Sequence, residues 1–172
     1  RDRPPLVSTT PYRPGLIPVV FVHGTASSIV RWGEMYNRLA ADVEIRRRFQ
    51  FWFFQYDSGA PIALSAMHLR EALSAAVARL DPAGKDPALR QMVLIGHSQG
   101  GLLVSATMLQ RPELFGAVVA TVPLMDMRRY HRLLAGHSWV GEYGDPDKPE
   151  DWAFISKYSP YQNVLRGRPY PK

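Results

Sequence analysis

The stretch that most constrains the fold of this chain runs from Met92 to Gly101. A short apolar run leads directly into Gly-His-Ser-Gln-Gly, and an amphipathic segment follows. An apolar run of this length, bounded by a turn signal, predicts a buried strand. Gly96 and Gly100 stand where a Cβ atom would crowd the neighbouring backbone of a tight turn. The stretch therefore predicts a strand, a sharp turn centred on Ser98, and a helix.

The residues around this turn suit attack on a carbonyl group. The pattern is that of a nucleophile elbow, in which the serine Oγ is exposed at the end of a strand. Attack also requires donors for the developing oxyanion and a base. The backbone N–H of Gln99, at the head of the predicted helix, is one candidate donor, and the loop after the first predicted strand offers the backbone N–H groups of His23, Gly24 and Thr25. The alternative is a Gly-rich turn with no chemical role.

The base is less clearly marked than the nucleophile. In this architecture the acid and the histidine follow the serine along the chain, on loops after later strands. The histidines downstream of Ser98 are His131 and His137, and Asp126 follows the last predicted strand. These three residues are candidate triad partners, and the alternative is that they are ordinary loop residues. His97 is expected to pack rather than to act as the base.

The remaining pattern predicts an α/β fold. Apolar runs at Leu16–Val22, Phe49–Tyr56 and Ala117–Val122 predict buried strands, and Ile62–Leu80 repeats apolar residues every three to four positions, as a helix does. The alternation of strand and helix implies parallel strands with right-handed crossovers. We therefore expect a doubly wound, mostly parallel sheet with about four core strands.

The composition is typical of one globular domain. The 172 residues are 46% hydrophobic and 21% charged, which is enough apolar material for a core. We expect a single domain over residues 1–172. Within it, residues 1–15 are an extended leader, residues 16–122 are the sheet core, and residues 123–172 are a loop and pocket region.

The sequence carries few signs of other partners. The net charge is +6, but the basic residues are scattered and no nucleic-acid motif is present, so no nucleic-acid partner is expected. No apolar run reaches 18 residues, so no transmembrane segment is expected. The absence of cysteine excludes disulfides and thiolate metal sites. With no metal or cofactor motif, we expect neither group, and the oligomeric state and compartment stay open.

Two family resemblances meet at the predicted elbow. From about residue 17 to residue 101 the chain resembles bacterial α/β-hydrolases of the esterase/lipase type. The residues that carry this resemblance are Phe21–Thr25, Arg31-Trp32, Phe51–Tyr56 and Gly96–Gly101. From about residue 100 to the end it resembles the catalytic domain of the prolyl oligopeptidase family. The carrying residues there are Gly100–Val104, Gln110–Val118, Met125–Met127, Gly136–Trp139, Asp145, Lys157–Pro160 and Asn163-Val164.

The second resemblance implies a substrate pocket. By this resemblance Trp139, Tyr143 and Leu124 fall where the peptidase family lines its proline-accepting pocket, and a flat aromatic face suits a compact pyrrolidine ring. The alternative is that Trp139 packs its loop on the core. The resemblance also implies that the family's acid and histidine fall beyond Lys172. Its oxyanion tyrosine is replaced here by the loop that contains Gly24.

Together these features predict a serine hydrolase of the prolyl oligopeptidase type. It would cleave peptide bonds of a small peptide through an acyl-enzyme on Ser98. One alternative is a carboxylesterase or lipase that uses the same nucleophile on an ester substrate. The other is a catalytically incomplete or non-enzymatic binding domain that keeps the elbow.

Overall fold

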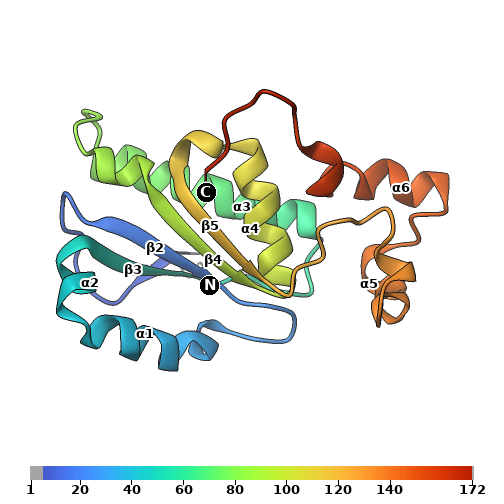
Figure 1. Cartoon of the computed structure of the whole chain (residues 1–172), viewed down its shortest axis with the longest axis horizontal. Helices are drawn as coiled ribbons and strands as arrows, with labels where there is room; N and C mark the ends of the chain where they lie inside the picture. Colours follow the sequence, from blue (N-terminus) through green and yellow to red (C-terminus); the bar gives the residue numbers. More distant parts are fainter. Residues whose placement is uncertain (1–5, 172) are drawn as a thin grey trace.

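A computed structural model describes residues 6–171 of the chain. Its centre is a five-stranded sheet with the strand order β1-β3-β2-β4-β5 (Figure 1). The strands are β1 (Leu6–Ser8), β2 (Ile17–Val22), β3 (Phe49–Phe54), β4 (Met92–His97) and β5 (Phe115–Thr121). Four of them are parallel, and β1 runs antiparallel to β3. The predicted mostly parallel α/β sheet is confirmed.

Part of the leader predicted over residues 1–15 belongs to the sheet. Its residues Leu6–Ser8 form β1, which pairs with the outer edge of β3. Residues 1–5 lie outside the described part of the chain. The three-residue strand exists because its backbone groups find partners on β3, and unpaired strand edges favour such additions.

Helices cover both faces of the sheet (Figure 1). The helices α3 (Ile62–Leu80) and α4 (Gln99–Gln110) pack on one face, and α1 (Gly33–Ala41) packs on the other. The remaining helical segments are short. They are η1 (Ile29–Trp32), α2 (Val43–Arg48), η2 (Pro87–Arg90), η3 (Pro112–Leu114), η4 (Tyr130–Arg132), η5 (Gly136–Trp139), α5 (Val140–Tyr143), α6 (Pro149–Ile155) and η6 (Tyr161–Asn163).

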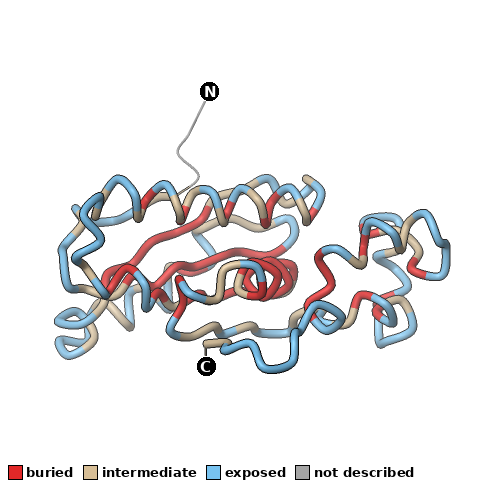
Figure 2. The backbone as a smooth tube through the Cα atoms, turned by 90° about the horizontal axis from the view of Figure 1, so that it is seen from above, coloured by how far each residue is buried: buried red, intermediate tan, exposed pale blue. Residues whose placement is uncertain are grey.

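The central strands supply apolar side chains to both faces because successive residues of a strand point in opposite directions. In β2, Val20 and Val22 join the core under α3 and α4, whereas Val19 and Phe21 join the core under α1. Figure 2 shows the buried residues gathered in these strands and in α4. The continuous apolar runs of the sequence are therefore explained by a sheet that is covered on both faces.

The residues after β5 form a lobe beside the carboxyl ends of the strands (Figure 1). It contains η4, η5, α5 and α6, and the described residues after Thr121 include no further strand. β5 pairs with β4 alone and forms one edge of the sheet. Among the described residues, no helix is both long enough and apolar enough to cross a membrane.

Candidate active site

Ser98 occupies a strained turn between β4 and α4. Its backbone angles are φ 55° and ψ −123°, a region that residues with a side chain rarely adopt and that costs energy to hold. Its N–H donates to the carbonyl of Thr121 at 2.9 Å, and its carbonyl accepts from Gly101 N at 2.8 Å. The last residue of β5 and the first turn of α4 therefore hold the strained conformation in place.

The flanking glycines allow the strand, the turn and the helix to approach closely. A Cβ atom on Gly96 would overlap the backbone of Gly100, and a Cβ atom on Gly100 would overlap the carbonyl oxygens of Val22 and His23. The first turn of α4 thus lies directly against the end of β2. This contact explains why the Gly-x-Ser-x-Gly spacing suits a strand-to-helix turn packed on a neighbouring strand.

The loop after β2 reaches the candidate nucleophile. A Cβ atom built on Gly24 would lie 3.0 Å from the carbonyl oxygen of His97 and 3.1 Å from Ser98 Cβ. Gly24 itself is buried, and Thr25 next to it is exposed. The structure therefore brings the predicted oxyanion loop and the elbow together. The role of Gly24, Thr25 and Gln99 as oxyanion donors stays a prediction.

His23 is enclosed by the loops around the site. The residue is fully buried, and its ring stacks on Tyr56 with a centroid separation of 4.4 Å. Its Nδ1 lies 3.0 Å from the carbonyl oxygen of Gly24. Burial lowers the pKa of His23, and the Gly24 carbonyl offsets this only in part. The stacked ring and its contact with the Gly24 carbonyl therefore support the loop after β2.

Burial of His23 leads to a pH prediction. Because the folded chain lowers its pKa below the ordinary 6.5, the unfolded chain binds the proton more readily, and stability falls as the pH drops through this range. Between about pH 7.5 and pH 5.5 we expect the unfolding free energy to fall, by at most about 1.4 kcal/mol per pH unit from this group. His23→Phe keeps the ring stack but has no titrating group there, so its unfolding free energy should fall less over the same pH range. Urea unfolding at both pH values measures the difference, and equal falls in both proteins would contradict it.

The side chain of Gln99 connects several loops at the site. Gln99 is 2% exposed. Its Oε1 lies 3.0 Å from the hydroxyl of Tyr56, and its Nε2 donates to Ser58 O at 3.1 Å and to Glu142 Oε1 at 3.0 Å. The Tyr56 hydroxyl also lies 2.8 Å from the carbonyl oxygen of His23. Tyr56, Ser58 and Glu142 were not predicted as site residues, although Tyr56 ends a predicted strand and Ser58 follows it, at the edge of the sheet where such sites form.

Helix α5 brings the predicted pocket toward the elbow. Tyr143 is 8% exposed, and its hydroxyl contacts the side chains of Glu142, Thr25 and Gln99. Burial raises the pKa of Tyr143, and the charge of Glu142 raises it further, so the phenol is neutral. The predicted pocket residue Tyr143 and the predicted oxyanion loop are therefore in contact.

The other two pocket residues differ in exposure. Trp139 is 38% exposed at the end of η5, and Leu124 packs partly buried against the core. An exposed indole at the rim of a site can stack on a ligand ring. Their role in binding substrate stays a prediction.

Two of the three candidate triad partners, Asp126 and His131, bond to other residues. Asp126 accepts from Gln162 Nε2 at 2.7 Å and from Arg129 Nε at 2.6 Å. Burial raises the pKa of Asp126, but these two bonds outweigh it and the net pKa is lowered. His137 is exposed in η5. Within residues 6–171, no hydrogen bond joins Asp126, His131 or His137 to Ser98, and their assignment as triad members stays a prediction.

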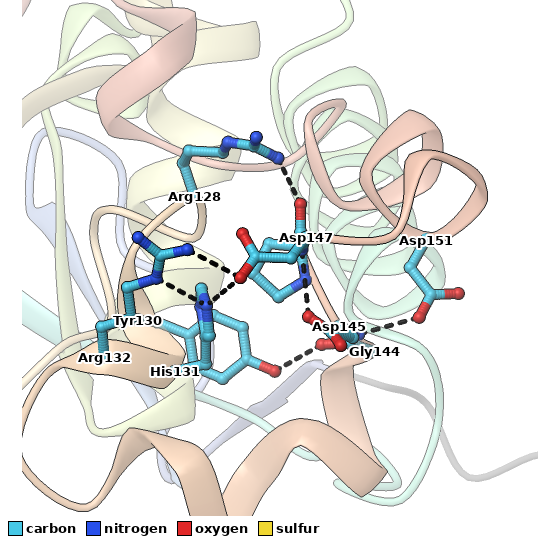
Figure 3. Close-up of polar contacts among 9 residues, drawn as sticks. Arg128, Tyr130, His131, Arg132, Gly144, Asp145, Asp147 and Asp151 are labelled. Carbon is cyan, nitrogen blue, oxygen red and sulfur yellow. Dashed lines mark hydrogen bonds and ion pairs between the residues drawn. The ribbon is translucent and has the colours of Figure 1, made fainter.

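His131 belongs to a polar cluster formed by η4 and the residues that follow α5 (Figure 3). Its Nε2 lies 3.1 Å from Asp147 Oδ2, and Arg132 donates to the same carboxylate oxygen at 2.7 Å. In the same cluster the hydroxyl of Tyr130 donates to the carbonyl of Gly144 at 2.6 Å. Side-chain oxygens of Asp145 and Asp147 and a ring nitrogen of His131 lie within 4.8 Å of one another. Because Arg132 already neutralises Asp147, the cluster is an ion-pair network that supports the end of α5.

A separate apolar groove lies on the α1 face of the sheet. It has a volume of about 690 Å³, and its lining includes Trp32, Met35, Ile95, Val119 and His97. Burial lowers the pKa of His97, and the nearby Arg31 guanidinium lowers it further. His97 therefore packs at the end of this groove, as an uncharged ring. The groove is not the place where the sequence predicted a substrate pocket.

The fold and the strained serine define an α/β-hydrolase. The prolyl oligopeptidase family profile matches residues 83–171, about half of the chain, and the PGAP1-like alpha/beta domain profile matches residues 13–125. The chain therefore belongs to the prolyl oligopeptidase family of serine peptidases through its second half, and its first two thirds belong with the PGAP1-like alpha/beta domains. Both profiles include the elbow, where the two predicted resemblances meet.

Individual relatives agree with this assignment. The chain is 55% identical over 76 residues to an uncharacterized peptidase of Rickettsia prowazekii. This match covers 44% of this chain and 10% of that protein. It is 47% identical over 74 residues to a prolyl endopeptidase of Dictyostelium discoideum, covering 43% of this chain and 10% of the relative. The matched segment thus spans about a tenth of the length of these curated relatives.

Solved structures resemble nearly the whole chain. A post-proline cleaving enzyme from Rickettsia typhi superposes with a TM-score of 0.73 and 28% identity, over 96% of this chain and 25% of that one. A prolyl endopeptidase gives a TM-score of 0.69 and 26% identity over the same shares. The fold prediction is therefore confirmed from the first strand to the lobe after β5.

Proposed function

We propose that this chain is the nucleophile-bearing part of a serine hydrolase that cleaves peptide bonds through an acyl-enzyme on Ser98. The observation that carries the proposal is the strained backbone of Ser98 at the start of α4, at φ 55°, with Gly24 packed beside it. A strand-to-helix turn of this kind exposes a hydroxyl for attack and turns backbone N–H groups toward the carbonyl oxygen. The N–H groups of Gln99 and of the Gly24-Thr25 loop are the donors we propose.

The proposed substrate is a small peptide with proline before the cleaved bond. The named relatives include prolyl endopeptidases, and an exposed indole at Trp139 beside the phenol of Tyr143 offers flat surfaces to a pyrrolidine ring. Leu124 completes the proposed pocket wall. The base is a histidine, with His131, His137 and a residue outside this chain as the candidates.

Substitution of Trp139 tests the pocket. With matched chromogenic peptides that carry proline or alanine before the scissile bond, we expect Trp139→Ala to lower the preference for proline about 3- to 10-fold, as loss of an aromatic stack should. Trp152→Ala, which removes an indole from α6, is the matched control and should keep the preference. The ratio of kcat/KM for the two peptides is the measurement. An unchanged ratio in Trp139→Ala would contradict the assignment of Trp139 to the substrate pocket.

A second candidate is a domain that keeps the elbow but lacks its base. It is favoured by one observation: within the described residues, neither downstream histidine bonds to Ser98. Such a domain would bind peptides without cleaving them. The esterase alternative keeps Ser98 and differs only in substrate, so the relative kcat/KM on matched ester and peptide bonds separates it from the peptidase.

A further inference from the structure

The side chain of Gln99 has no role in the chemistry proposed above, which uses only its backbone N–H. It is nevertheless buried, and both of its amide hydrogens are bonded. Its carbonyl oxygen faces the Tyr56 hydroxyl, and its two amide hydrogens go to Ser58 O and Glu142 Oε1. A buried amide whose two hydrogens are both paired fixes the relative position of the groups that accept them, because losing either acceptor leaves a buried N–H unpaired.

This side chain and its partners come from three different parts of the chain. Tyr56 and Ser58 follow β3, Gln99 begins α4, and Glu142 lies in α5. The Ser58 hydroxyl in turn accepts from Ala26 N at 3.0 Å, so the loop after β2 is also connected. The amide of Gln99 therefore connects the loop after β3 to α5, and the loop after β2 joins them through Ser58.

Helix α5 depends on such contacts for its place. It has only four residues, and a helix this short has no stability of its own in water. Its far end is held by the hydroxyl of Tyr130, which bonds Gly144 O, and by the carboxylate of Asp151, which accepts from Asp145 N at 2.8 Å (Figure 3). On the side facing the elbow, Glu142 and Tyr143 contact Gln99.

We propose that Gln99 is a positioning residue whose side chain, bonded to Glu142, holds α5 and the adjacent Trp139 against the elbow. The residue that supplies the candidate oxyanion N–H would then also set the position of the candidate pocket wall. The functional meaning of this connection rests on the proposed function, whereas the connection itself is independent of whether Ser98 reacts. Glu142 is the partner that can be changed with least disturbance, because it is exposed.

Fluorine NMR of the full chain labelled with 5-fluorotryptophan tests this directly. The chain has four tryptophans, so Trp→Phe variants assign each signal. In Glu142→Ala and in Gln99→Ala we expect the Trp139 signal to move toward its position in the urea-unfolded chain. The signals of the buried Trp32 and Trp52 should stay in place, which shows that the sheet is folded.

A conservative variant separates positioning from general damage. Glu142→Gln keeps an oxygen that can accept from Gln99 Nε2, so its Trp139 signal should match the wild type. In Glu142→Ala the amide of Gly144, which bonds Val140 O at 2.9 Å, should also exchange with deuterium about 10-fold faster, as expected for a locally loosened segment.

Two results would overturn the proposal. One is a Trp139 signal that stays at the wild-type position in both Glu142→Ala and Gln99→Ala. The other is a Glu142→Gln signal displaced as far as that of Glu142→Ala. Ser98→Ala is included as a control and should leave all four signals in place. A chain that shows the expected shifts but does not react at Ser98 would contradict the proposed function and still agree with this inference.

Discussion

Gly100→Ala should lower the unfolding free energy of the chain more than any surface substitution does. The new Cβ atom would overlap the carbonyl oxygens of Val22 and His23, and both belong to backbone at the end of β2, which cannot rotate aside as a side chain can. We expect a loss of at least about 3 kcal/mol in unfolding free energy, at the upper end of the cost of overpacking. Urea unfolding followed by circular dichroism measures this loss.

Gly33→Ala is the matched control for that experiment. Gly33 is also a helical glycine, but a Cβ atom there meets nothing within 4 Å. Replacement should be neutral or should stabilise the chain by up to about 1 kcal/mol, because alanine has the higher helix propensity. If Gly100→Ala were as stable as Gly33→Ala, the close contact between α4 and the end of β2 would be wrong.

Ser98→Ala should remove hydrolysis while the fold stays intact. The substitution deletes only the hydroxyl. In other serine hydrolases, loss of the serine nucleophile lowers kcat by about 10³-fold or more. We expect a fall of at least that size in kcat with peptide and ester substrates alike. Alanine keeps the Cβ atom at φ 55° and the backbone hydrogen bond from residue 98 to Thr121, so the thermal unfolding midpoint should barely change.

Ser105→Ala provides the matched serine control. Ser105 lies in the same helix, where its hydroxyl donates to Gly101 O at 2.8 Å and faces no loop of the candidate site. The hydrolysis rate of Ser105→Ala should stay within a factor of about 3 of the wild-type rate, because Ser105 makes no contact that strengthens in the transition state. A comparable loss of activity in both variants would mean that α4 is being disturbed rather than that a nucleophile is being removed.

The sheet and the long helices could be predicted because local pattern and packing agree there. The helix predicted from the apolar repeat is found at Ile62–Leu80, and the helix after the elbow is found at Gln99–Gln110. The helix α2 was missed because its six residues include three consecutive arginines and carry no apolar repeat. Its start depends on Asp42, whose carboxylate accepts from Glu44 N and Ile45 N.

The candidate site was only partly predictable, for a physical reason. Gly96, Ser98 and Gly100 lie within five consecutive residues, so one local pattern fixes their geometry. The contact between Gln99 and Glu142 joins residues 43 positions apart, and no local pattern marks such a pair. The strand β1 was missed on the same ground, because it exists only through pairing with β3.

The most direct test of the account is covalent labelling of the intact chain with a fluorophosphonate probe, followed by peptide mass spectrometry. We expect one adduct, located on Ser98, in the wild-type chain and none in Ser98→Ala. Labelling would then place an activating base within the chain, and His131→Ala and His137→Ala would identify it. A folded wild-type chain that takes up no probe, or an adduct that persists in Ser98→Ala, would contradict the assignment of Ser98 as an activated nucleophile.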